Sequence, residues 1–300
     1  MPLIENRFEL CLATGRNGCV RRSCAHVLLV SGLLGGLFST MGGEEAAAQT
    51  KLDARYSASL AGLPIGRGSW VVTVTDDQFT ASASGATAGL MRMFSSGRGT
   101  TVARGWLSGG HFVSSDYATA IITDKRTDEV KMSVAGGTLK ETTVIPPVPK
   151  DPDRVPLTDA HRRGVIDPMT AAVMRVPGNG DMAGAEACQR TLKIFDGRVR
   201  YDLTFRFKRT EKVKAEKGYE GQAAVCGVSF QPIAGHVPDR SAIKWLREQT
   251  DIEVWLVPIA GTRVLVPFKM QIPTPIGMGL LQATQFVTGP ASATASAKTQ

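Results

Sequence analysis

The side chains that could carry out catalysis or bind a metal are few and widely spaced in this sequence. After the first fifty residues the histidines are His111, His161 and His236, and none stands at metal-ligand spacing from a cysteine or an acidic residue. The Gly-x-Ser-x-Gly motif of serine hydrolases does not occur. Residues 178–180 (Gly-Asn-Gly) lack the Lys-Ser/Thr that a phosphate-binding loop requires. We therefore assign no catalytic residue, no metal site and no cofactor.

The cysteines divide into two groups. Cys11, Cys19 and Cys24 lie near the N-terminus, which leaves Cys188 and Cys226 in the remainder of the chain. An even number of cysteines in an exported chain favours a disulfide. In the chain-entropy model such a bridge would add roughly 3–4 kcal/mol to the free energy of unfolding. The alternative is a pair of buried free thiols.

Two apolar segments are candidates for ligand binding. Residues 88–94 could form a short helix over a hydrophobic cavity, and residues 276–281 combine apolar side chains with two glycines that permit close backbone approach. The candidate ligand contacts are Leu90, Met91, Met93, Phe94, Ile276 and Met278. The alternative is that both segments simply fill the core.

The first 48 residues have the organisation of a secretory signal peptide. The basic pair Arg21-Arg22 precedes an uncharged apolar run at residues 27–38, and residues 46–48 (Ala-Ala-Ala) supply a small-residue cleavage site. The alternative is a membrane-spanning helix, but such a helix needs roughly 20 apolar residues and this run is shorter. We expect export, cleavage after Ala48 and a soluble protein without a membrane-spanning segment.

The net charge of the chain is +8, and the first 48 residues contain equal numbers of basic and acidic residues. A basic surplus favours anionic partners such as phospholipid headgroups. The alternative is charge that only maintains solubility, because the lysines and arginines are scattered. Export and the absence of a recognised binding motif argue against nucleic acid.

Most of the chain after the leader alternates between apolar and polar residues, as β-strands do. Strands are expected at residues 52–60, 68–75, 78–84, 100–107, 111–123, 130–134, 138–144, 189–194, 198–208, 221–231, 252–258, 262–271 and 279–288. Short helices are expected at 88–94, 169–174 and 241–249, the second because Asp167-Pro168 is a helix-start pattern.

This pattern predicts a mainly β protein, built as one strongly curved antiparallel meander that forms an open or half-closed barrel with a few short helices. Prolines at residues 145–157 predict a linker inside a single domain that spans residues 49–288. Residues 289–300, rich in Ala, Ser and Thr, are expected to be a disordered tail.

Several motifs together resemble the DUF3108 family of exported proteobacterial envelope proteins. They are residues 60–66 (Leu-Ala-Gly-Leu-Pro-Ile-Gly), 89–94, 165–168 (Val-Ile-Asp-Pro), 188–203 and 273–277 (Pro-Thr-Pro-Ile-Gly). The resemblance implies a β-rich protein of the cell envelope, which we place in the periplasm. The family has no assigned reaction, so no catalytic residue follows from it.

Three functions fit these observations. The favoured one is a non-catalytic binding or carrier protein that holds a lipid or another amphiphile of the cell envelope inside its curved sheet. The second is a structural protein that supports the envelope through contacts with partner proteins. The third is an enzyme, which would need a histidine beside a carboxylate that the sequence does not place together.

Overall fold

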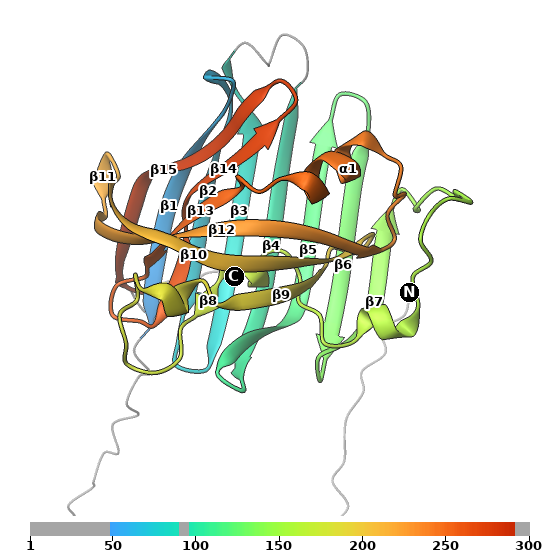
Figure 1. The fold of residues 1–300 in the computed structure, drawn as a ribbon. Coiled ribbons are helices and arrows are strands. Elements are labelled where there is room, and N and C mark those ends of the chain that lie inside the picture. Colours follow the sequence, from blue (N-terminus) through green and yellow to red (C-terminus); the bar gives the residue numbers. More distant parts are fainter. Residues whose placement is uncertain (1–48, 90–95, 292–300) are drawn as a thin grey trace, which may run out of the picture. The chain divides into compact units, whose positions relative to one another are not determined.

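The computed structural model describes residues 49–89 and 96–291 of the chain (Figure 1). The predicted leader at 1–48 and the last nine residues, 292–300, therefore lie outside the described residues. The described part is mainly β, as the sequence predicts. It contains no helix that is long and apolar enough to cross a membrane.

The first half of the described chain is a run of antiparallel strands that pair with their neighbours in sequence. The strands alternate between buried and exposed residues, as in β1, where Leu52, Ala54 and Tyr56 are buried. The paired glycines at 109–110 and 136–137 have positive φ and form the expected tight turns. The strands are β1 (Thr50–Leu60), β2 (Leu63–Val74), β3 (Gln78–Thr87), β4 (Gly97–Ser108), β5 (His111–Thr123), β6 (Thr127–Ala135) and β7 (Thr138–Ile145).

The second half contains the three longest strands, β10, β12 and β15, and two very short ones, β8 and β11. In Figure 1, β9, β10 and β12 run across β4, β5 and β6. The strands are β8 (Met174–Arg175), β9 (Arg190–Phe195), β10 (Arg200–Lys214), β11 (Lys217–Gly218), β12 (Glu220–Ala234), β13 (Glu253–Pro258), β14 (Val264–Thr274) and β15 (Gly277–Pro290). β15 includes Gly289 and Pro290, so the first two residues of the predicted tail belong to a strand.

The strands form one open sheet, as the sequence predicts, and the strand order shows that two successive meanders join within it at β1 and β15. The order is β7-β6-β5-β4-β3-β2-β1-β15-β14-β13-β12-β10-β9, so the first and last strands of the described chain pair with each other. Pairing β1 with β15 satisfies the backbone groups that each would otherwise expose at an edge. The sheet is not closed, because its edge strands β7 and β9 are not hydrogen-bonded to each other.

The segment after the proline-rich linker contacts both of these edge strands. Gly164 donates its N–H to the carbonyl of Gly137, next to β7, at 2.7 Å. Ile166 donates to the carbonyl of Lys193 in β9 at 2.9 Å, and its own carbonyl accepts from Phe195 at 3.0 Å. Residues 163–166 therefore bridge the gap between the two edges of the open sheet.

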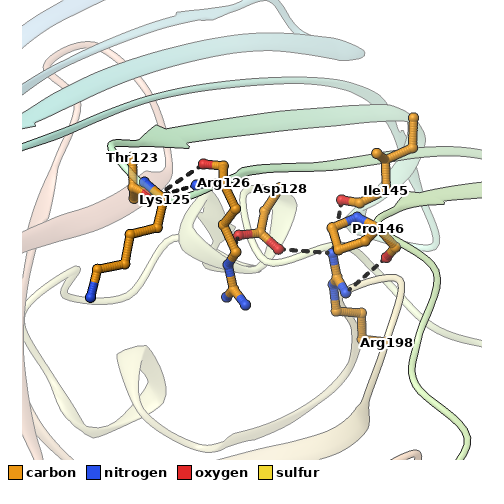
Figure 2. Close-up of polar contacts among 7 residues, drawn as sticks. All are labelled: Thr123, Lys125, Arg126, Asp128, Ile145, Pro146 and Arg198. Carbon is orange, nitrogen blue, oxygen red and sulfur yellow. Dashed lines mark hydrogen bonds and ion pairs between the residues drawn. The ribbon is translucent and has the colours of Figure 1, made fainter.

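A second contact between the halves comes from the turn that connects β9 to β10. Asp196 caps this turn by accepting the N–H groups of Arg198 and Val199. Figure 2 shows the Arg198 side chain pointing at Asp128 of β6 and at the carbonyls of Ile145 and Pro146, at 3.4, 3.2 and 3.4 Å. The linker residues after β7 are thereby attached to the second meander.

The helical predictions had three different outcomes. The expected helix at 241–249 is present as α1 (Ser241–Glu248). The one expected at 169–174 is wrong in length: only a 3₁₀ turn, η3 (Thr170–Ala172), forms, because Met174 already belongs to β8. Most of the helix expected at 88–94 lies outside the described residues. The other 3₁₀ turns are η2 (Asp159–Arg162) and η4 (Ala185–Ala187).

The core has two parts. The larger part joins the inner faces of both meanders and includes Trp70, Phe79, Trp255 and Phe268. The smaller part lies on the other face of β12 and β13 and includes the two cysteines. Residues 223–226 and 254–257 are accordingly buried without alternation, as expected for strands that are covered on both faces.

Candidate functional site

An open, mostly apolar cavity of about 370 Å³ lies on the inner face of the sheet. Its walls come from β1 to β5 on one side, from β14 and β15 on another, and from the segment around η3. The lining residues are Tyr56, Gly68, Ser69, Trp70, Ala83, Ser84, Thr101, Tyr117, Pro168, Met169, Ala172, Pro267, Met270 and Leu281. Its volume falls within the range of roughly 300–1,000 Å³ that is typical of small-molecule sites.

A row of glycines explains why the sheet is hollow beside Tyr56. Gly68 lies opposite Tyr56, Gly85 lies opposite Gly68, and Gly99 lies opposite Gly85 on the next strand. Since strand residues directly opposite each other share a face, all four positions face inward. Three neighbouring strands therefore carry no side chain at this level of the inner face, and Gly68 borders the cavity.

Three aromatic side chains form the more polar part of the cavity wall. Tyr56 donates its hydroxyl to the carbonyl of Pro267 at 2.7 Å, and its burial raises the pKa of this hydroxyl. Burial, together with the nearby Asp167 carboxyl, raises the pKa of Tyr117 to about 12. The buried Nε1 of Trp70 has no hydrogen-bond partner among the described residues. Both tyrosines are thus neutral at physiological pH.

The wall opposite β4 and β5 is held in place by the buried carboxylate of Asp167. One carboxylate oxygen accepts the N–H groups of Met169 and Thr170, each at 2.8 Å. The other accepts the hydroxyls of Ser114 and Thr170, each at 2.5 Å. These bonds attach η3 to β5 and place Met169 against the cavity.

Asp167 is the most deeply buried carboxylate near the cavity, with only 1% of its surface exposed. Burial raises the pKa of its carboxyl, while the bonds from Ser114, Thr170 and Met169 act in the opposite direction. Both oxygens are occupied by protein donors, and Asp167 does not line the cavity. Its arrangement is that of a structural anchor for η3.

The structure places the predicted ligand residues away from this cavity or outside the described part. Leu90, Met91, Met93 and Phe94 lie outside the described residues. Ile276 and Met278 lie at the β14–β15 hairpin, where 71% and 42% of their surfaces are exposed, and they do not line the cavity. A role for these residues in ligand binding stays a prediction.

Most of the cavity residues that the sequence analysis missed come from strands that it had located. Tyr56, Trp70, Ala83 and Thr101 each occupy an inward position on β1, β2, β3 or β4. The alternation within each strand could have assigned them to the inner face. Alternation could not show that Met270 and Leu281 of the distant β14–β15 hairpin would line the same cavity.

Cys188 and Cys226 form a disulfide, with their Cα atoms 5.5 Å apart. Cys188 directly follows η4, and Cys226 lies in β12 opposite Phe207 of β10. The bridge therefore connects the segment before β9 to β12, across β10. Both cysteines are fully buried in the smaller part of the core.

Residues 49–89 and 96–291 contain no group of three or more His, Cys, Asp or Glu side chains that could hold a metal ion. His161 accepts the N–H of Thr158 through Nδ1 at 3.1 Å and helps to cap η2. His236 is buried, and burial is the main reason why its pKa is lowered.

Fold and cavity together define an antiparallel β protein with an apolar site on the inner face of an open sheet. The chain belongs to the DUF3108 family, proteins of unknown function, whose model matches residues 55–284. No curated protein matches the sequence. A solved structure, a β-barrel-like protein of the domain of unknown function DUF1849 from Brucella abortus, is similar with a TM-score of 0.43 and 10% identity. The similarity covers 82% of this chain and 99% of that chain.

Proposed function

We propose that this chain is a periplasmic, non-catalytic binding or carrier protein for an apolar or amphiphilic molecule of the cell envelope. The cavity beside Tyr56, Trp70 and Tyr117 is the observation that carries the proposal. Its apolar walls would remove a hydrocarbon segment from water, which contributes roughly 25 cal/mol for each Å² that is buried. The features of a signal peptide in residues 1–48 support the location.

The chemistry of the cavity supports a ligand with a small polar group. The polar side chains on the inner face of its lining are Trp70 and the hydroxyl-bearing Tyr56, Tyr117 and Thr101. The described residues at the cavity include no lysine, arginine, aspartate or glutamate side chain. A molecule with a hydrocarbon body and a neutral hydrogen-bonding group therefore fits better than a fully charged one.

The direct test is native mass spectrometry of protein purified from its own cells, followed by lipid extraction. We expect a bound molecule that is released by organic solvent. A mass equal to that of the protein alone, with protein partners recovered by crosslinking in cells, would instead support a structural role in the envelope.

Variants that fill the cavity make this test specific. Ala83→Leu and Ala172→Leu add three carbons each to the lining and should abolish retention of the ligand. Ala118→Leu is the matched control, because Ala118 lies opposite Val102 on the outer face of β5. Equal retention by all three variants would contradict the assignment of this cavity.

A further inference from the structure

A second cavity, of about 410 Å³, lies between the start of β6, the linker after β7 and the β9–β10 turn. Four arginines line it, namely Arg126, Arg154, Arg198 and Arg240, and Asp128 is its one lining carboxylate. The formal charge of these side chains is 4 − 1 = +3. The fold thus brings together four arginines that lie far apart in the sequence.

Two of the four arginines are held by the protein itself. Arg126 pairs with Asp128 at 2.6 Å, and its side chain is 69% exposed. Arg198 contacts the same carboxylate and the carbonyls of Ile145 and Pro146 (Figure 2). Because one carboxylate serves both guanidinium groups, the positive charge around it is only partly compensated.

The other two arginines have donors that the protein does not use. Arg154 donates from Nη1 to the carbonyl of Gly235, while its buried Nε has no partner among the described residues. Arg240 comes within 3.9 Å of Asp151, which is beyond hydrogen-bonding distance. Arg154 makes one side-chain hydrogen bond, and the largely exposed Arg240 has only a long contact with Asp151, so both guanidinium groups keep donors for an anion.

We propose that this cavity binds the phosphate group of a small organic phosphate. Planar guanidinium groups match the geometry of phosphate oxygens and bind them through paired hydrogen bonds. A phosphate monoester carries about −1.5 to −2 charges at pH 7, which balances much of the charge of the arginines. A cavity of 410 Å³ has room for an organic body beside the phosphate, against Val148 and Pro149.

The test is calorimetric titration of the processed protein with glycerol 3-phosphate at low ionic strength, with glycerol as the uncharged control. We expect glycerol 3-phosphate to bind and glycerol not to bind. Added salt should weaken the binding of glycerol 3-phosphate. Arg154→Gln combined with Arg240→Gln should weaken it about tenfold or more, which corresponds to the loss of one charge-assisted hydrogen bond. Arg206→Gln combined with Lys217→Gln removes two exposed charges of β10 and β11 and should leave binding unchanged.

If the double variant fails to fold, Arg240→Gln alone can be tested in its place, because the Arg240 side chain is 61% exposed. No binding of glycerol 3-phosphate, or equal weakening by both double variants, would overturn the proposal. Equal affinity for inorganic phosphate would overturn the assignment of an organic ligand. The two cavities share no lining residue, so neither outcome affects retention of an apolar molecule beside Trp70.

Discussion

The Arg198 guanidinium and the Asp128 carboxylate lie 3.4 Å apart and join the β9–β10 turn to the start of β6. Their side chains are 27% and 20% exposed, so water screens the pair only in part. The neighbouring Gly197 packs so closely on Val130 that a Cβ at this position would collide with it. Since β7 and β9 do not pair, this contact and residues 163–166 both connect the two meanders away from the β1–β15 pair.

Arg198→Gln should therefore lower the free energy of unfolding by about 1–3 kcal/mol, because it removes charge-assisted hydrogen bonds in a half-buried site. Urea denaturation of the purified protein measures this change. Arg126→Gln is the matched control: it removes the other partner of Asp128, but from an exposed position, and should cost about 0–1 kcal/mol. Equal losses in the two variants would show that Arg198 does not hold the turn.

Cys188→Ser should lower the free energy of unfolding by roughly 2–5 kcal/mol under oxidising conditions, because the cross-link restricts the unfolded chain. The difference from the wild type should largely disappear when unfolding is measured with a strong reductant. Denaturation curves with and without reductant check both statements. A variant as stable as the wild type without reductant would contradict a stabilising disulfide.

Because of Asp167, the free energy of unfolding should decrease as the pH rises above about 3.8. Burial raises the pKa of the folded carboxyl above its ordinary value of 3.8, so the folded state holds a proton that the unfolded state has lost. Its contribution to stability is thus fully present below pH 3.8 and is lost as the pH rises to the folded pKa. Asp167→Asn, measured by denaturation at several pH values, should lack this part of the pH dependence. An unchanged profile would contradict the raised pKa.

Trp70 should report ligand binding in the apolar cavity. Titration with a medium-chain fatty alcohol should change the intrinsic fluorescence of the wild type, because Trp70 lines the cavity. Trp70→Phe should lose most of this change. Trp106→Phe is the control and should keep it, because Trp106 is 38% exposed and does not line the cavity. Loss of the signal in the control alone would place the ligand elsewhere.

Expression in a Gram-negative host should yield a chain whose mass lacks residues 1–48 and which is released with the periplasmic fraction. The physical reason is the short apolar run at 27–38 followed by three alanines at 46–48. Intact mass spectrometry of the fractions is the measurement. An unprocessed chain that stays in the cytoplasmic fraction would contradict export.

Local patterns were sufficient to locate the strands of the described residues, except for the two-residue strands β8 and β11. Strand residues alternate between two faces, so the sequence around Leu52, Ala54 and Tyr56 already shows which side chains turn inward. The helix at 241–249 and the pairing of the last two cysteines were also predictable from local pattern and residue count. The 3₁₀ turn at Thr170–Ala172 was overestimated because the helix-start signal at Asp167 does not reveal how soon β8 follows.

The sequence by itself determined the β class, the inward faces of the strands and the disulfide, because these depend on alternation and on the number of cysteines. Only the tertiary structure decided that β1 pairs with β15, that Met270 and Leu281 close the cavity beside Trp70, and that four arginines converge near Asp128. These features join residues far apart in the chain, and pairing between distant strands leaves no local periodicity that could predict it.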